Sequence, residues 1–141
     1  MTQNDRNAPI GIFDSGIGGL TVAKEIIHKL PAENIIYLGD TARVPYGTKS
    51  SRTVVTYSER NTGFLVSKKI KLLVVACNTA SSVALPFLRN KHDIPVLGVI
   101  DPGAKKAARS TRTNKVGVIG TPSTIGRGGY EKALKNIEPG I

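Results

Sequence analysis

LLVVACNTA, residues 72–80, is an apolar run that turns polar directly after the only cysteine of the chain, Cys77. A cysteine that only packs in a core is expected inside such a run, whereas Cys77 stands at its carboxyl end and is followed by Asn78 and Thr79. Ligands bind at the carboxyl ends of strands in open α/β sheets, and the first N–H groups of a following helix would stabilise a thiolate there. We therefore predict a nucleophile or proton-transfer thiol, with a buried packing cysteine as the alternative.

A second polar strand end comes earlier in the chain. Residues 10–13 are apolar and are followed at once by DSGIGG, residues 14–19. Glycines allow close approach and expose backbone N–H groups, which suits a carboxylate or another small anion. The dinucleotide fingerprint G-x-G-x-x-G is not met, because Thr21 stands in the place of its last glycine, and no P-loop pattern is present. The segment favours a small anionic ligand over a nucleotide.

Short apolar runs alternate with longer stretches of helical spacing along the chain. This alternation is typical of β-α-β-α folds, and almost continuously apolar strands indicate a parallel sheet covered on both faces. We predict an α/β fold with a parallel sheet flanked by helices. Helical spacing is clearest at 20–30, 50–69 and 130–137, and the five expected strands are 10–13, 35–38, 72–76, 96–100 and 116–119.

Polar groups follow all five apolar runs. The ends of parallel strands open on one side, so these hydroxyls, an amide, a thiol and a carboxylate are expected to converge, and they suit a small zwitterion with carboxylates without a metal. For each hydroxyl taken singly, helix capping is the alternative. The loop at 44–48, VPYGT, could cover such a pocket. The groups lie at 14–15, 39–41, 77–79, 101–103 and 120–124.

Length and composition indicate one modest soluble domain, because the 141 residues are 40% apolar and 21% charged. A single cysteine excludes an intramolecular disulfide and disfavours a structural zinc site, and a reducing cytoplasm fits best. Residues 1–8 are polar and carry both charge signs, so we expect neither a signal peptide nor a transit peptide there. No apolar run approaches the length that a membrane-spanning helix needs, and we expect no membrane partner.

The net charge of +10 raises the question of an acidic partner. A basic chain can attract nucleic acid over long range. Here, however, Lys and Arg punctuate the expected helix ends, notably at 68–71 and 105–115, with no interleaved aromatic side chains for base stacking. The pattern favours solvated helix faces, and a nucleic-acid surface stays the alternative.

Five segments together resemble a known family. In order and spacing they are similar to the motifs of the cofactor-independent glutamate racemases, members of the wider aspartate/glutamate racemase group. The resemblance covers nearly the whole chain from Pro9. The segments are IGIFDSGIGGLTVAKEI at 10–26, YLGDTARVPYG at 37–47, LLVVACNTA at 72–80, IPVLGVIDPG at 94–103 and VGVIGTPSTI at 116–125.

The resemblance implies a fold, a reaction and a site. Residues 1–98 are expected to form a racemase-like (flavodoxin-like) lobe, and 99–141 to begin a second, similar lobe. The family racemises glutamate with two opposed cysteines and without pyridoxal phosphate or a metal, supplying D-glutamate for peptidoglycan, and a cytoplasmic homodimer is expected. Cys77 resembles the first thiol, and Asp14 the acidic residue that assists it or holds the substrate ammonium. The expected substrate contacts are Asp14, Ser15, Tyr46, Gly47, Asn78, Thr79, Thr121 and Thr124.

The chain also departs from the family pattern. Family members run to roughly twice this length and carry a second Cys-Thr-His motif, whereas this sequence has no cysteine after Cys77. We therefore expect a racemase cut short, with an uncovered sheet edge, whose single thiol exchanges the α-proton on one face only. The run 126–129, GRGG, has more glycines than the family usually carries, which is expected to weaken a helix.

Two further functions stay open at this stage. One is an amino-acid binder without turnover. The other is a basic partner-binding module of the kind reported to inhibit DNA gyrase in some members of the family. Within the enzyme class, aspartate is the nearest rival substrate to glutamate.

Overall fold

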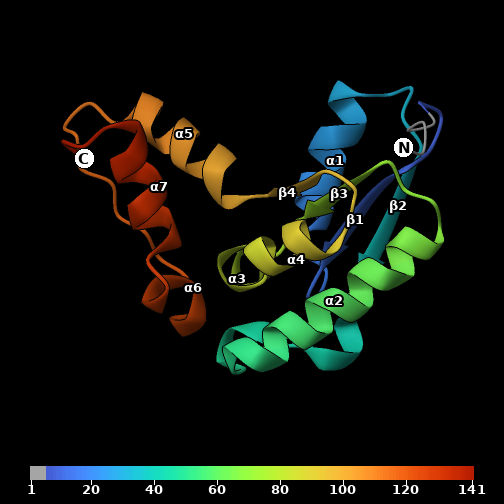
Figure 1. Cartoon of the computed structure of the whole chain (residues 1–141). Helices are drawn as coiled ribbons and strands as arrows, with labels where there is room; N and C mark the ends of the chain where they lie inside the picture. The colour runs from blue at the N-terminus through green and yellow to red at the C-terminus, as the bar shows by residue number, and fades with distance from the viewer. Residues whose placement is uncertain (1–5) are drawn as a thin grey trace.

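The computed structural model describes residues 6–141, so the expectation about a targeting segment at 1–8 falls largely outside the described chain. A four-stranded parallel sheet forms the centre of the larger lobe (Figure 1). Its strands follow the order β2-β1-β3-β4. The strand that leads into DSGIGG, β1, therefore lies beside the strand that leads into Cys77, β3. The strands are β1 (Ile10–Asp14), β2 (Ile35–Gly39), β3 (Leu72–Val75) and β4 (Val96–Gly98).

Both faces of the central strands β1 and β3 are buried, as their apolar sequences predicted. Side chains alternate along a strand, so neighbours in sequence point to opposite faces. Ile12 and Val74 pair in register and face helix α1 (Leu20–Lys29), where Ala23 completes a small core. Phe13 and Val75 pair in register and face the opposite, larger core. In β1 and β3 the polar side chains are thereby confined to the strand ends.

Three helices cover the larger core: α2 (Ser51–Ser67), α3 (Asn78–Val83) and α4 (Leu85–Lys91). Figure 1 shows α1 and α2 on opposite sides of the sheet. The Ser50 side chain caps α2 by accepting a hydrogen bond from the Thr53 N–H at 3.2 Å. Val54 and Leu65 of α2 are fully buried in this core. The helices expected at 20–30 and 50–69 are confirmed.

A smaller unit follows β4. It consists of α5 (Ile100–Ser110), α6 (Pro122–Gly126) and α7 (Gly129–Ile137), which lie together apart from the sheet in Figure 1. α5 packs against α7, and Leu134 and Ala104 are buried. Gly128 is the N-cap of α7 and has a φ of 60°, a left-handed conformation that favours glycine. The glycines at 126–129 therefore lie at the junction of α6 and α7: Gly126 ends α6, Gly128 caps α7 and Gly129 begins it. None of them stands in the interior of a helix.

The prediction of a fifth strand at 116–119 is wrong. The sheet has four strands, and these residues run without regular structure between α5 and α6. A strand exists only where a neighbour completes its hydrogen bonds. Helix α5 leads the chain away from β4, and no strand within residues 6–141 pairs with this segment. Ile119 is consequently 98% exposed. Residues 120–124 thus do not end a strand of this sheet.

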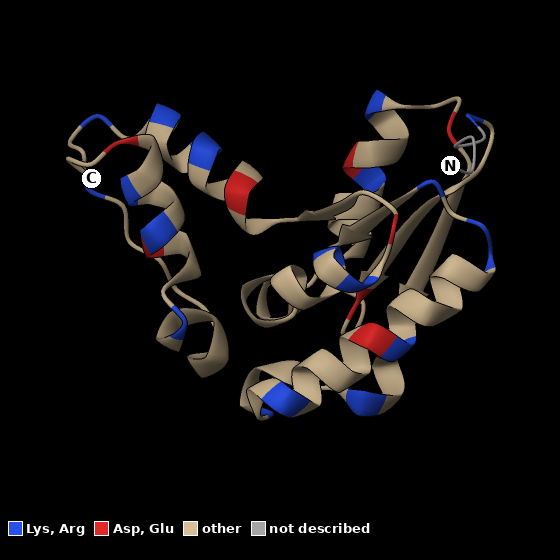
Figure 2. Cartoon of the chain, in the orientation of Figure 1, with Lys and Arg blue, Asp and Glu red and all other residues tan. Residues whose placement is uncertain are grey.

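Basic side chains are distributed over the outer surface of both units. Figure 2 shows Lys and Arg along α5 and α7 and near the ends of α1 and α2. None of the helices described between residues 6 and 141 combines the length and the apolar character needed to cross a bilayer.

Two leucines on adjacent strands provide a test of the buried sheet. Leu73 in β3 is 0% exposed, and Leu97 in β4 is 50% exposed. Leu73→Ala should lower the free energy of unfolding by about 2–5 kcal/mol, because it leaves a cavity in the larger core. Leu97→Ala should lower it by about 1 kcal/mol or less. Urea unfolding of the two variants measures both values, and equal losses would contradict this description of the core.

Candidate active site

A cavity of about 810 Å³ lies between the carboxyl ends of β1 and β3 and the smaller unit. The residues that line it come from the loop after β1 with the start of α1, from the start of α3, from α5, and from the segment 116–121 with α6 and α7. The strand ends and the second unit therefore face one another across an open space, as expected for a site at the carboxyl edge of a parallel sheet. The predicted site residues on its wall are Asp14, Ser15, Cys77, Asn78, Thr79, Thr121 and Thr124.

Cys77 belongs both to the core and to the cavity wall. It is the N-cap residue of α3, where its Sγ accepts a hydrogen bond from the Ala80 N–H at 3.4 Å. The thiol also donates to the Ser15 hydroxyl across the neighbouring strand end, with an Sγ to Oγ distance of 3.3 Å. Both contacts suit a thiolate, because the backbone N–H and the hydroxyl can each donate to a negative sulfur. Cys77 therefore packs in the core and also lines the cavity, so its interpretations as a packing residue and as a reactive thiol are compatible.

Asp14 is held rigidly at the end of β1. Its Oδ2 accepts hydrogen bonds from the backbone N–H groups of Gly16 at 3.1 Å and Gly19 at 3.0 Å. Gly19 is the N-cap of α1, so the carboxylate lies over the N-terminus of that helix, where negative charge is stabilised. The side chain is buried and lines the cavity together with Cys77.

Tyr37 holds the loop that carries Ser15 in place by a hydrogen bond. Its hydroxyl donates to the Gly16 carbonyl at 3.1 Å. Burial, and then the nearby acidic groups of Asp14 and Cys77, raise the pKa of the Tyr37 phenol above its ordinary value. The phenol therefore stays a neutral donor. From the sequence, Tyr37 was expected only to lie within a strand.

Three threonine hydroxyls meet at the far wall, and we call Thr79, Thr121 and Thr124 the hydroxyl cluster. The Thr79 Oγ1 lies 3.1 Å from that of Thr121 and 3.2 Å from that of Thr124, and the last two are 3.0 Å apart. Thr121 also caps α6 by accepting from the Thr124 N–H. Helix capping and cavity lining are thus combined in one residue. The cluster joins the larger lobe to the smaller unit.

Asn78 makes a second bridge between the two units. Its Oδ1 accepts a hydrogen bond from the Tyr130 hydroxyl of α7 at 2.7 Å. Burial raises the pKa of the Tyr130 phenol, which favours the protonated donor. Tyr130 lines the cavity, although the sequence predicted only that it begins a helix at 130–137. The sequence offered one indication, because the Tyr130 hydroxyl is a polar group at the start of an otherwise apolar helix face.

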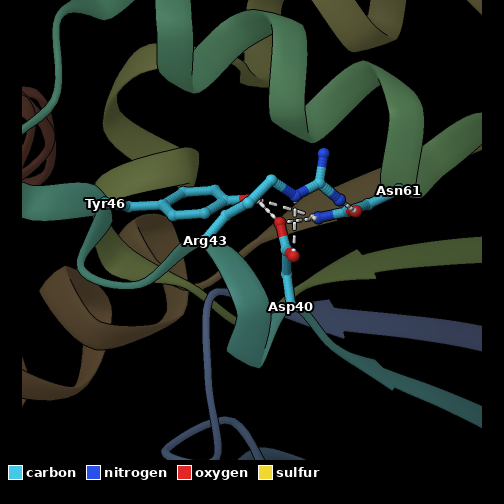
Figure 3. A network of polar contacts seen from close by, with 4 residues as sticks. All are labelled: Asp40, Arg43, Tyr46 and Asn61. Atoms are coloured by element: carbon cyan, nitrogen blue, oxygen red, sulfur yellow. Dashed lines mark hydrogen bonds and ion pairs between the residues drawn. The ribbon is translucent and has the colours of Figure 1, made fainter.

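Tyr46 is placed differently from the other predicted site residues. Neither it nor Gly47 lines the cavity, and the Tyr46 side chain is only 1% exposed. Its hydroxyl donates to Asp40 Oδ2 and accepts from Asn61 Nδ2 at 3.0 Å (Figure 3). Arg43 completes this group through a 2.8 Å ion pair with Asp40. We call Asp40, Arg43, Tyr46 and Asn61 the anchor network.

Three members of the anchor network were not predicted from the sequence to form a functional group. Asp40 was noted only as part of a strand end, and Arg43 and Asn61 were not singled out. Asn61 offered a signal, because it stands four residues before Leu65 on the buried face of α2 and is itself 2% exposed. A polar residue on an apolar helix face calls for a buried partner.

The Gly47 backbone touches the smaller unit. A Cβ atom at this position would lie 2.4 Å from Thr121 Cβ. The 3₁₀ turn η2 (Tyr46–Thr48) therefore packs directly against the start of α6.

No group of three His, Cys, Asp or Glu side chains suited to a metal ion is found within residues 6–141. The expectation of a site without cofactor or metal stays a prediction.

Comparison with known proteins adds a family. The model of the Asp/Glu/hydantoin racemase family matches residues 10–140. A glutamate racemase from Geobacter metallireducens is 62% identical over 132 residues, which are 94% of this chain and 49% of that protein. The chain spans about half the length of the curated relatives it matches.

Solved structures agree in fold. The glutamate racemase isoform RacE1 from Bacillus anthracis has a TM-score of 0.92 at 47% identity, over 96% of this chain and 51% of that one. The glutamate racemase from Francisella tularensis, solved in complex with D-glutamate, has a TM-score of 0.86 at 43% identity, over 96% and 51% of the two chains. The predicted racemase-like α/β architecture is confirmed.

Two glycines test the packing of η2. Gly47→Ala should lower the free energy of unfolding by about 1–3 kcal/mol, because the new methyl group meets the branched carbon of Thr121. Gly63→Ala in α2 should raise it by about 0.5–1 kcal/mol, since no atom lies within 4 Å of its new methyl group and alanine favours helix. Thermal and urea unfolding compare the pair. A Gly47→Ala chain as stable as the parent would contradict the contact.

Alkaline titration tests the environment of Tyr46. Burial, and then the hydrogen bond to Asp40, raise the pKa of its phenol above the ordinary 10.0. A pKa raised by folding stabilises the fold fully below the unfolded value near 10, and this contribution is lost as pH rises toward the folded value. In ultraviolet titration of the folded chain, Tyr46→Phe should remove the phenol that ionises at the highest pH. Loss of a phenol with an ordinary pKa would contradict the burial of this hydroxyl.

Proposed function

The chain belongs to the Asp/Glu/hydantoin racemase family, and on that premise we propose that it carries the first thiol of a glutamate racemase that interconverts L- and D-glutamate. The observation that supports this most directly is the position of Cys77. Its Sγ lies on the cavity wall beside Ser15 and shares that wall with Asp14. The site thus combines a base, a carboxylate and several hydrogen-bond donors.

The proposed substrate matches the wall chemistry. Asp14 supplies a fixed negative charge for an ammonium group, and the hydroxyl cluster supplies donors for carboxylates. The relatives named glutamate racemase, and the Francisella tularensis protein in complex with D-glutamate, favour glutamate over aspartate. The geometry of residues 6–141 alone is compatible with either acid.

The proposed step is a proton transfer at the α-carbon. The Cys77 thiolate takes the α-proton and becomes a thiol, while the electron pair of the C–H bond stays on the carbon and delocalises into the α-carboxylate. Hydrogen bonds to that carboxylate stabilise the developing charge. Return of a solvent-derived proton by the same thiol exchanges the proton without inversion. Return from the opposite face inverts the centre.

Inversion needs a second acid that faces Cys77 across the substrate. Cys77 is the only cysteine of the 141 residues. Because the curated relatives are about twice as long as the stretch they share with this chain, we propose that sequence outside these residues supplies the second acid. Residues 99–141 then form the beginning of the second lobe, after a first lobe of residues 1–98.

The family membership also supports a cellular role. We propose a cytoplasmic enzyme that works as a homodimer and supplies D-glutamate for peptidoglycan, without pyridoxal phosphate or a metal. The relatives named glutamate racemase support this role.

Proton NMR of glutamate in deuterium oxide tests the proposed step. The chain should exchange the α-proton of at least one enantiomer. Cys77→Ser should slow this exchange by about 10²-fold or more, because it removes the base. Ser67→Ala, at the exposed end of α2, should leave the rate unchanged.

The outcomes separate the functions. Exchange without inversion means a competent first half-site, and exchange with inversion means that another group completes the pair. Binding of glutamate with no exchange at any rate would overturn the enzyme in favour of an amino-acid binder. Exchange that survives Cys77→Ser would overturn the role of the thiol.

A further inference from the structure

The anchor network is a buried polar group outside the cavity, and the proposed reaction does not use it. Its members come from the end of β2, the turn that follows, η2 and the middle of α2 (Figure 3). Five hydrogen bonds join the four side chains. Buried polar networks of this kind fix one arrangement, because each member left unpaired costs stability.

The Asp40 carboxylate is the centre of this network. Its side chain is 4% exposed, so its charge depends on partners within the protein. Arg43 provides the counter-charge, and the Tyr46 hydroxyl and the Asn61 amide donate to Oδ2. Arg43 also donates to Asn61 Oδ1 at 3.0 Å, which closes the network into a ring. The position of the Tyr46 ring is therefore specified at its polar end.

One end of the network is tied to the strand that carries Asp14. The Asp40 N–H donates to the Asp14 carbonyl at 2.9 Å and so extends the ladder between β1 and β2. Asp40 cannot move independently of the residue that precedes the glycine-rich loop. The anchor network is therefore connected at Asp40 to the backbone of a residue that lines the cavity, Asp14.

The other end reaches the hydroxyl cluster. Tyr46 opens η2, and the next residue, Gly47, lies so close to Thr121 that not even a methyl group would fit between them. Thr121 in turn bonds to Thr79 and Thr124. A displacement of the Tyr46 ring would therefore be passed through the Gly47 backbone to the far wall of the cavity.

We propose that the anchor network positions the hydroxyl cluster, by holding the Gly47 backbone against Thr121. Asp40, Arg43 and Asn61 are then positioning residues that act through Tyr46 and touch no ligand themselves. The network sets the distance between Asp14 on one wall and the threonine hydroxyls on the other. The inference rests on the proposed function, in which those hydroxyls receive the substrate carboxylate.

Two tyrosines provide a matched pair of variants. Tyr46→Phe removes the hydroxyl at the centre of the network and keeps the ring. Tyr57→Phe removes a hydroxyl from the adjacent ring, whose centroid lies 5.6 Å away, and within residues 6–141 that hydroxyl makes no hydrogen bond. The Arg43 guanidinium lies 4.8 Å from the Tyr57 ring centroid, a contact that the control retains.

NMR of the chain with labelled threonine methyl groups measures the effect without a ligand. Tyr46→Phe should weaken the nuclear Overhauser contact between Gly47 Hα and the Thr121 methyl group. It should also shift the methyl signals of the hydroxyl cluster by more than their linewidth. Tyr57→Phe should leave the contact and these signals at their parent values, and both variants should leave the signal of Thr113, exposed after α5, unchanged.

Arg43→Lys keeps the experiment decisive if Tyr46→Phe fails to fold. The Arg43 side chain is 30% exposed, and lysine keeps the charge but cannot bridge Asp40 and Asn61 with a planar fork. It should shift the same methyl signals in a folded chain. Parent signals in a folded Tyr46→Phe or Arg43→Lys chain would overturn the inference. Equal shifts from both tyrosine variants would overturn it too, because ring packing would then be the cause.

Titration with D-glutamate separates this inference from the proposed function. If the parent chain binds D-glutamate, Tyr46→Phe should weaken the affinity about tenfold to a hundredfold, and Tyr57→Phe should leave it unchanged. Parent affinity in the folded Tyr46→Phe chain would overturn the positioning role. Failure of the parent chain itself to bind would count against the proposed function, while the methyl signals would still decide whether the network holds the cluster.

Discussion

Burial of the sheet on both faces is the constraint from which the site follows. With α1 on one face and α2, α3 and α4 on the other, side chains along the strands have to be apolar, as Ile12, Phe13 and Val75 are. Polar groups are then admitted only where a strand ends. In a parallel sheet those ends meet at one edge, so Asp14 and Cys77, which stand at the ends of the paired strands β1 and β3, come together there.

The same constraint explains why the smaller unit docks where it does. Asn78 and Thr79 start α3 at the sheet edge with free hydrogen-bonding capacity, and Tyr130 and the threonines of α6 satisfy it. These contacts are hydrogen bonds between polar side chains, unlike the apolar cores on either side of the sheet. A cavity remains between the two units, lined by the strand ends on one side and by segment 116–121 on the other.

The anchor network shows how a buried charge can serve a site that it does not enter. Asp40 is out of contact with the cavity, yet its main chain is bonded to Asp14 and its side chain holds Tyr46. Desolvating a carboxylate is costly unless every partner is present, so the network allows one arrangement and resists others. That rigidity is useful beside the proposed proton-transfer site, where small displacements of a donor carry large kinetic penalties.

The apolar runs and helical spacing of the sequence by themselves determined β1 to β4, α2 and α7. They also determined that Asp14 and Cys77 stand at strand ends. Both results follow because the burial of these segments depends on residues close in sequence. Only the tertiary structure decided that 116–119 is no strand, that the Tyr46 hydroxyl turns toward Asp40, and that Asn61 meets it from the middle of α2. Each of these depends on a partner far away in the chain: a strand needs a neighbour, and a side chain takes the direction in which its polar end is paired. Local pattern specifies which segments are buried, whereas pairing and side-chain direction are set by contacts between segments.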